Sequence, residues 1–438
     1  MRITELYEHQ KQALEVTADQ NHVAYYHDMG LGKTFTGAEK MVQLDADVNL
    51  IICQKSKIDD WISHFEKYYH KQVWDLTDKT QFKSFFEDIS EDDPFYLTVG
   101  VINYELAFRR KELLNLRDFT LLLDESSMIT NETAKRSKFI LKLQPANVIL
   151  LSGTPTGGKY EKLWSQMKLL GWNIPKKMFY DHYVDYHYED NEGFPLMIID
   201  GYKNEERLKR KMRDHGCHFL MTDEVFDLPE QIHQTIRVNT TKEYRKFKKD
   251  SIVSISKIFY MDGLKDNPVI EDVDLVGDTT LTKMLYERQL CGQYNEDKLA
   301  AFEDLLESTE DRLIVFYNFN EELAALRKIT DKCGRESGFI NGSGRSMYAY
   351  EYCINGVTFI QYQAGAMGLN LQKANKIVYF TPPLSSELFE QSKKRIHRIG
   401  QDKTCFYYYL TCKNSVEEKI YKTLAMRKDY TEALFEEE

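Results

Sequence analysis

The stretch that decides the fold is His27-Asp28-Met29-Gly30-Leu31-Gly32-Lys33-Thr34. Gly30 and Gly32 let backbone N–H groups turn inward around phosphate oxygens, and a helix that follows presents its positive end to the same anion. Lys33 is placed to bridge the β- and γ-phosphates of a nucleotide, and the Thr34 hydroxyl can bind Mg²⁺. The stretch predicts an ATP- and Mg²⁺-binding loop, with His27 standing where the commoner pattern has its first glycine.

Short, largely apolar runs around this loop predict buried strands of a parallel sheet. They are Asn49 to Cys53 and Phe119 to Leu123, and the second ends in Asp124-Glu125. We expect Asp124 to hold Mg²⁺ through water and Glu125 to orient and deprotonate the attacking water. An acidic turn at the surface is the alternative for an isolated Asp-Glu pair. The order of loop, carboxylates and Leu151-Ser152-Gly153-Thr154-Pro155 favours the catalytic interpretation.

A second distinctive run lies far along the chain, Gln391-Ser392-Lys393-Lys394-Arg395-Ile396-His397-Arg398-Ile399-Gly400-Gln401. Phosphoryl transfer develops negative charge that a guanidinium from another domain can neutralise. We therefore expect Arg395 and Arg398 to contact the γ-phosphate of a nucleotide held by the loop. This pairing predicts a motor built from two domains.

Ten ordered segments, spanning about residues 6 to 401, resemble those of superfamily 2 helicase-type ATPases, and most closely the Swi/Snf-like double-stranded DNA translocases. The segments of the first half are Leu6 to Gln10, Asp28 to Thr34, Ile52 to Ser56, Thr98 to Leu106, Asp124-Glu125 and Ser152 to Pro155. Those of the second half are Arg312 to Phe319, Asn341 to Ser343, Gly365 to Leu371 and Gln391 to Gln401. The ending His397-Arg398-Ile399-Gly400-Gln401 is the most family-specific string.

The resemblance implies a role for individual residues. Gln10 would contact the edge of the adenine base, Gly368 and Gln391 would also contact the nucleotide, and Arg395 and Arg398 would be arginine fingers. The residues implied to contact nucleic acid are Lys55, Ser56, Asn103, Gly153, Thr154, Gly342, Ser343 and Asn370. The implied activity is ATP hydrolysis that drives movement along duplex DNA.

Three stretches depart from the family pattern. Ser126-Ser127 follows Asp124-Glu125 where the family usually has Ala-His, so the histidine proposed to relay the nucleotide state is absent. Thr381 to Ser386 replaces a tryptophan-containing stretch, and Cys217 to Met221 replaces a basic segment. From the first change we expect altered coupling between the nucleotide state and movement. At the other two stretches we expect fewer of the DNA contacts that the family makes.

Length and strand-helix alternation predict the domain organisation. At 438 residues the chain exceeds the usual size of a single core. The expected fold is α/β, with two RecA-like parallel-sheet lobes and a helical insertion between them. We place lobe 1 at residues 1–165, the insertion at 166–295, and lobe 2 at 296–438, closing with a helix over Val416 to Phe435. Two such lobes leave no room for a further large module.

Charge and cysteine content limit the partners. A net charge of −11 argues against a uniformly basic DNA-binding surface, so we expect a local basic stripe. The runs Lys203 to Arg213 and Lys242 to Lys249 are candidates, although such runs are more often solvated helix faces. Seven cysteines without metal-binding spacing predict free thiols, no zinc and a reducing compartment. Without a signal peptide or an apolar run of ~20 residues, we expect a cytoplasmic protein, in the host cytoplasm if viral, that contacts no membrane.

The expected partner is double-stranded DNA, together with replication, recombination or defence proteins. One alternative keeps the same chemistry in a strand-separating helicase that acts on forked or single-stranded DNA or RNA. Another is a nucleotide-controlled DNA clamp with little turnover, motivated by the missing histidine after Glu125.

Overall fold

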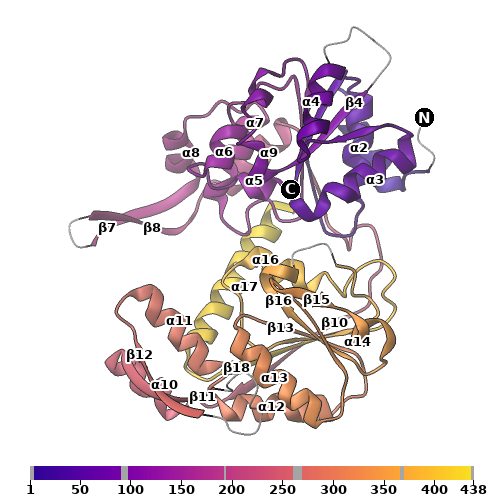
Figure 1. The fold of residues 1–438 in the computed structure, drawn as a ribbon. Coiled ribbons are helices and arrows are strands. Elements are labelled where there is room, and N and C mark those ends of the chain that lie inside the picture. The colour runs from indigo at the N-terminus through magenta and orange to yellow at the C-terminus, as the bar shows by residue number, and fades with distance from the viewer. Residues whose placement is uncertain (1–3, 90–96, 192–193, 260–268, 366–368, 436–438) are drawn as a thin grey trace. The chain divides into compact units, whose positions relative to one another are not determined.

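The computed structural model describes residues 4–89, 97–191, 194–259, 269–365 and 369–435 (Figure 1). The chain divides into two compact units, each with a seven-stranded sheet. The N-terminal unit comprises residues 1–227 and 427–438, and the C-terminal unit comprises residues 228–426. The predicted α/β class with two mainly parallel sheets is confirmed. The three-part division at residues 165 and 295 stays a prediction.

The sheet of the N-terminal unit is parallel throughout, in the order β3-β4-β2-β5-β6-β1-β9. The strand runs predicted around residues 49–53 and 119–123 are confirmed as β2 and β5. The strands are β1 (His22–His27), β2 (Val48–Cys53), β3 (Val73–Asp75), β4 (Thr98–Asn103), β5 (Thr120–Asp124), β6 (Asn147–Ser152) and β9 (Cys217–Leu220).

Successive strand residues in this sheet face two different cores. In β5, Leu121 and Leu123 join one buried cluster and Leu122 joins the other. Burying such a side chain contributes about 1.5–3 kcal/mol to the free energy of folding. This contribution explains why helices cover both faces of the sheet. The helices of the unit are α1 (Glu8–Val16), α2 (Lys33–Gln43), α3 (Ile58–Tyr69), α4 (Lys79–Asp88), α5 (Tyr104–Ala107), α6 (Lys135–Ile140), α7 (Trp164–Leu169), α8 (Lys176–Tyr183) and α9 (Glu205–Asp214), with 3₁₀ turns η1 (Lys55–Lys57), η2 (Lys111–Asn115), η3 (Ser126–Ile129) and η4 (Tyr160–Leu163).

The sheet of the C-terminal unit has the order β10-β18-β17-β13-β16-β14-β15. Every neighbouring pair is parallel except the hairpin of β14 and β15. The strands are β10 (Gln231–Val238), β13 (Leu313–Tyr317), β14 (Ser337–Asn341), β15 (Gly344–Ser346), β16 (Val357–Gln361), β17 (Lys376–Tyr379) and β18 (Cys405–Cys412).

Helices cover both faces of this second sheet as well. Phe302 of α12 and Leu326 of α13 pack on one face, and Phe389 of α16 and Leu424 of α17 pack on the other. The helix predicted from Val416 to Phe435 is confirmed as α17. The helices of the C-terminal unit are α10 (Lys242–Asp250), α11 (Thr280–Cys291), α12 (Glu296–Glu307), α13 (Asn320–Lys332), α14 (Tyr348–Tyr352), α15 (Tyr362–Gly365), α16 (Ser386–Lys393) and the part of α17 (Val416–Phe435) up to residue 426.

Residues 166–295, predicted to be helical, contain more strand than expected. Besides helices α8 to α11, the described part holds the antiparallel hairpin β7 (Val184–Asn191) and β8 (Phe194–Tyr202), which extends away from the N-terminal unit (Figure 1). A second antiparallel pair is β11 (Ile252–Phe259) and β12 (Val269–Val276). The tyrosines and isoleucines of the first hairpin favour strands, and this preference outweighs the helical pattern of the flanking segments.

Candidate nucleotide-binding site

The predicted site residues of the N-terminal unit gather at one edge of its sheet. Because all strands are parallel, their carboxyl ends meet at the same edge, where ligands bind in open α/β sheets. The chain segments that leave this edge carry every predicted site residue of the unit except Gln10: Gly30 to Thr34 after β1, Lys55 and Ser56 after β2, Asn103 at the end of β4, Asp124 and Glu125 at β5, and Gly153 and Thr154 after β6.

The phosphate loop connects β1 to α2 through two residues with positive φ. Gly30 has φ of 93° and Gly32 has φ of 70°, a region that favours glycine. Lys33 begins α2, and its Nζ donates to the carbonyl oxygens of His27 at 2.8 Å and Asp28 at 3.1 Å. A Cβ added at Gly153 would lie 3.4 Å from Lys33 Nζ, so the turn after β6 adjoins the loop.

Gln10 of α1 is fixed against this loop. Its Nε2 donates to the carbonyl oxygens of Leu31 at 3.3 Å and Gly32 at 3.2 Å, and its Oε1 accepts from Tyr7 N at 3.0 Å. A Cβ at residue 32 would lie 2.4 Å from Gln10 Nε2 and would displace the end of that side chain, while the positive φ itself favours glycine at this position. The residue predicted to contact the base therefore adjoins the residues predicted to bind phosphate.

Asp124 is oriented by two aromatic residues that sequence reasoning did not assign to it. Trp61 Nε1 donates to Asp124 Oδ2 at 2.8 Å, and the Tyr104 hydroxyl donates to the Asp124 carbonyl oxygen at 2.9 Å. Burial raises the pKa of the Asp124 carboxyl, while the Trp61 hydrogen bond and the Lys33 ammonium oppose that rise. Oxygen atoms are the ligands that Mg²⁺ prefers, so the Asp124 carboxylate and the Thr34 hydroxyl are of the right chemical type to hold this ion.

Glu125 adopts the left-handed conformation, with φ of 60°, which is uncommon outside glycine and frequent at functional sites. Its Oε1 accepts hydrogen bonds from the Ser127 hydroxyl at 3.3 Å and the Ser152 hydroxyl at 3.1 Å. Ser152 Oγ also accepts from Thr154 N at 3.2 Å. The turn after β6 is thus joined directly to the predicted catalytic carboxylate.

Gln166 of α7 is a buried residue that sequence reasoning missed. Its Oε1 accepts from the hydroxyls of Tyr26 at 3.0 Å and Ser126 at 2.7 Å, and its Nε2 donates to the Pro155 carbonyl oxygen at 2.7 Å. One amide therefore joins the strand before the loop, the turn after β5 and the turn after β6. The only sequence signal is a polar residue among the apolar positions of a short helix.

The predicted DNA-contacting residues of the N-terminal unit differ in exposure. Lys55 and Ser56 are exposed in η1, whereas Asn103 is buried and its Nδ2 donates to Glu105 Oε2 at 2.9 Å. Thr154 is buried too, and its Oγ1 has no hydrogen-bond partner among the described residues. Only the first two present side chains broadly to solvent.

The two basic runs fall on helices α9 and α10. In α9, Lys209 pairs with Glu206 at 3.0 Å and Lys211 pairs with Asp214 at 3.1 Å. Acidic residues of the same helix thus neutralise part of the run. Lys209 is also buried, so the run offers fewer free positive charges to a phosphate-binding stripe.

In the C-terminal unit, Gln391 lies on α16 and the two arginines follow in the turns after it. Arg395 is 3% exposed, and its Nη1 donates to the Leu369 carbonyl oxygen at 3.4 Å. Arg398 is half-buried, burial lowers its pKa, and its Nε has no partner among the described residues. Gly368 lies outside the described residues.

The remaining predicted nucleic-acid contacts of this unit lie in turns. Gly342 and Ser343 connect β14 to β15, where Asn341 Oδ1 accepts from Ser343 N at 3.0 Å and Gly344 N at 3.2 Å. Asn370 is exposed. Gly342, Ser343 and Asn370 are thus placed in the structure, but their predicted role stays a prediction.

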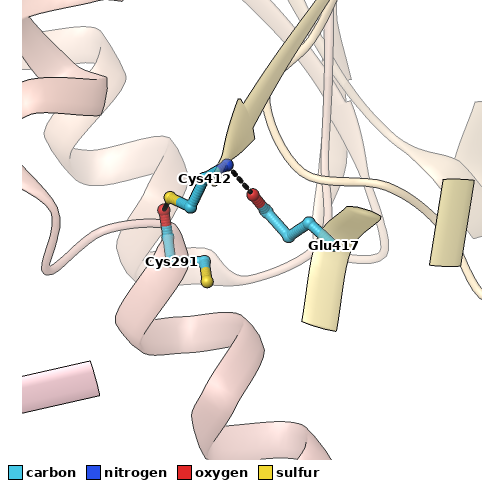
Figure 2. Close-up of side chains that lie close together, drawn as sticks. All are labelled: Cys291, Cys412 and Glu417. Atoms are coloured by element: carbon cyan, nitrogen blue, oxygen red, sulfur yellow. Dashed lines mark hydrogen bonds between the residues drawn. The ribbon is translucent and has the colours of Figure 1, made fainter. Parts of the chain in front are cut away.

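Of two clusters of potential metal ligands among the described residues of the C-terminal unit, one is fully buried. Cys291, Cys412 and Glu417 are buried, with ligand atoms within 4.8 Å of one another (Figure 2). Lys298 Nζ lies 2.6 and 2.9 Å from the two Glu417 carboxylate oxygens, and Asn295 Nδ2 donates to Cys412 Sγ at 3.2 Å. A cation would have to displace this ion pair, so the cluster is explained as a buried polar contact between α11, α12, β18 and α17.

Fold and site together define a two-unit α/β protein with a phosphate loop, of the helicase-like ATPase class. The sequence matches the SNF2-related domain over residues 9–296 and the helicase conserved C-terminal domain over residues 297–400. The chain belongs to the SNF2-related family, as the resemblance predicted.

Curated relatives are similar along most of this chain. A SWI/SNF-related, matrix-associated, actin-dependent regulator of chromatin from Mus musculus (subfamily A member 1) is 23% identical over 90% of this chain and 39% of its own length. An ATP-dependent helicase of Mycoplasma genitalium is 22% identical over 90% of this chain and 38% of its own length. The chain thus spans about two fifths of these relatives.

Among solved structures, the Sulfolobus solfataricus SWI2/SNF2 ATPase core in complex with double-stranded DNA is similar, with 19% identity and a TM-score of 0.44. The similarity covers 98% of this chain and 93% of that one. Within the described residues, no helix is long and apolar enough to span a membrane.

Proposed function

We propose that this protein is an ATP-dependent motor that moves along double-stranded DNA. The observation that carries the proposal is the gathering of Lys33, Asp124, Glu125 and Ser152 at one sheet edge, with Gln10 against the phosphate loop. Such a site offers a nucleotide pocket together with a carboxylate that can act on water. Membership of the SNF2-related family supports DNA as the partner.

In the proposed reaction, Gly30 and Gly32 turn backbone N–H groups toward the phosphates and Lys33 neutralises their charge. Thr34 and Asp124 would hold Mg²⁺, which supplies further neutralisation of the phosphate oxygens when bound. Glu125 orients the attacking water and accepts its proton. Ser127 and Ser152 keep that carboxylate in place by hydrogen bonds to Oε1.

The second unit contributes the arginines of this proposal. Arg395 and Arg398 would stabilise charge on the γ-phosphate and so make hydrolysis depend on both units. DNA would be gripped by exposed polar residues, with Lys55 and Ser56 the best placed in the N-terminal unit.

The test is ATP hydrolysis titrated with duplex, forked and single-stranded DNA and with RNA, repeated across salt concentrations. We expect the strongest stimulation by duplex DNA and a steep loss of stimulation with salt, because backbone phosphate contacts release counterions. Stimulation by single strands or RNA alone would instead indicate a strand-separating helicase. Absence of turnover with every nucleic acid would indicate the clamp.

A further inference from the structure

Strand β9 brings the end of the segment 166–227 alongside the strand that leads into the phosphate loop. It pairs in parallel with β1, with Cys217 opposite Ala24 and Leu220 opposite His27. Beyond the strands, Asp28 N donates to the Leu220 carbonyl oxygen at 2.9 Å. The stretch that replaces the family's basic segment, Cys217 to Met221, therefore lies directly against the start of the loop.

Side chains extend this contact into the loop itself. The Thr222 hydroxyl donates to Asp28 Oδ2 at 2.7 Å, and both residues are buried. The other carboxylate oxygen, Asp28 Oδ1, accepts from Met29 N at 2.8 Å. One carboxylate therefore connects a loop backbone N–H to a hydroxyl from outside the loop. A second contact joins His27 Nε2 to His218 Nδ1 at 2.9 Å.

The direction of the loop N–H groups decides how well they meet phosphate oxygens. A hydrogen bond to a carboxylate is stronger than one between neutral groups, so Thr222 restrains the Asp28 side chain more than an ordinary hydroxyl contact would. Through Asp28 Oδ1 that restraint reaches Met29 N–H. Burial prevents water from freely replacing the Thr222 hydroxyl.

We propose that Thr222, assisted by His218, is a positioning residue for the phosphate loop, so that the segment 166–227 sets the affinity of the N-terminal unit for ATP. Thr222 acts through Asp28 and is not itself a catalytic residue. This inference rests on the proposed function only in taking ATP as the ligand of the loop.

The test compares four variants with the parent protein: Thr222→Val, Thr222→Ser, Thr222→Ala and Thr120→Val. Thr120 is a matched control, since it is buried in the same sheet and its hydroxyl accepts a hydrogen bond from Asn147 Nδ2 at 3.1 Å. Thr120 lies at the start of β5, which is the end of the strand opposite the site. For each variant one measures the ATP Kd by calorimetric titration, KM and kcat with duplex DNA, and the melting temperature.

We expect Thr222→Val to weaken ATP binding and raise KM on the order of tenfold, the loss expected for one hydrogen bond to a charged group. The value of kcat at saturating ATP should change by about twofold or less, because Glu125 and Asp124 are untouched. Thr222→Ser should restore most of the affinity. Thr120→Val should lower the melting temperature without changing the ATP Kd.

Parental ATP affinity in folded Thr222→Val protein would overturn the inference, as would an effect that Thr222→Ser fails to rescue. If Thr222→Val does not fold, Thr222→Ala decides by the same criterion, because it adds no methyl group beside Asp28. A parent protein that neither binds nor hydrolyses ATP would instead overturn the proposed function. The two failures are therefore distinguishable.

Discussion

Lys33 and Glu125 lie in the same predicted site, but substitutions at the two positions should affect different steps, ATP binding and ATP hydrolysis. Lys33 is proposed to supply positive charge to bound phosphates, so Lys33→Ala should weaken ATP binding itself. Glu125 is proposed to act on water, so Glu125→Gln should retain ATP binding and lose about 10²–10⁴-fold in turnover. Equilibrium binding and steady-state hydrolysis, measured on both variants, separate the effects. Parental turnover in Glu125→Gln would show that another group activates the water.

Ser152 offers a finer test, because its hydroxyl donates to Glu125 Oε1 and accepts from Thr154 N. Removing it in Ser152→Ala should lower kcat about tenfold, the loss expected when one hydrogen bond to a charged group disappears, with little change in ATP Kd. Ser137→Ala is a matched control, since Ser137 is buried in α6 and its Oγ has no partner among the described residues. Equal kcat in the two variants would contradict the account.

Single-residue roles were predictable only where a motif carries them. The loop glycines, Lys33 and Asp124-Glu125 could be assigned to one predicted site because the chemistry of phosphate binding limits the residue types and their order, and their roles stay predictions. The contacts of Trp61, Tyr104 and Gln166 depend on which strands become neighbours, and nothing in the local sequence states that. Ser127 was noted as a departure from the family, but its hydrogen bond to Glu125 emerges only from the backbone conformation of the turn.

Among elements, α3 carries a buried histidine that makes stability depend on pH. His64 is 7% exposed and lies among aromatic rings, with Phe35 at 4.5 Å and Tyr68 at 5.1 Å between ring centroids. Burial lowers the pKa of His64 to about 4. Because the unfolded chain binds the proton near pH 6.5, this contribution to stability is complete above pH 6.5 and is lost as pH falls toward 4.

We expect the N-terminal unit to lose up to about 3 kcal/mol of unfolding free energy from His64 between those pH values. Urea unfolding followed by tryptophan fluorescence measures it, because all four tryptophans lie within residues 1–227. His64→Phe keeps a ring of similar size and should show a smaller loss on acidification. An identical pH dependence in parent and variant would show that His64 does not contribute.

Helices and strands could be predicted from the sequence where burial is uniform. The prediction was wrong where tertiary packing decides the conformation. Strands β2 and β5 are buried on both faces, so their apolar runs were unambiguous. The described residues of the hairpin of β7 and β8 are mostly exposed or half-buried, and the helical patterns of the flanking segments concealed the strand preference of its tyrosines and isoleucines. Strand β9 has four residues, too short for a periodic signal.

The whole molecule combines two sheets, and turns at one edge of each sheet carry predicted site residues. The N-terminal unit contains the phosphate loop and the two carboxylates proposed to be catalytic, Asp124 and Glu125, whereas the arginine run belongs to the C-terminal unit. If hydrolysis depends on both, neither unit alone should turn over ATP. In the proposed function, this dependence would allow ATP hydrolysis to move one unit relative to the other, and so to move the protein along DNA.

The most direct measurement of this claim is ATP turnover by Arg398→Ala at saturating duplex DNA, with ATP Kd measured on the same protein. An arginine finger contributes roughly 10³–10⁵ in rate, so the variant should lose turnover by about that factor and bind ATP within a few-fold of the parent. Arg327→Ala, which removes an exposed arginine of α13, should retain parental turnover. Parental turnover in Arg398→Ala would contradict the two-unit site.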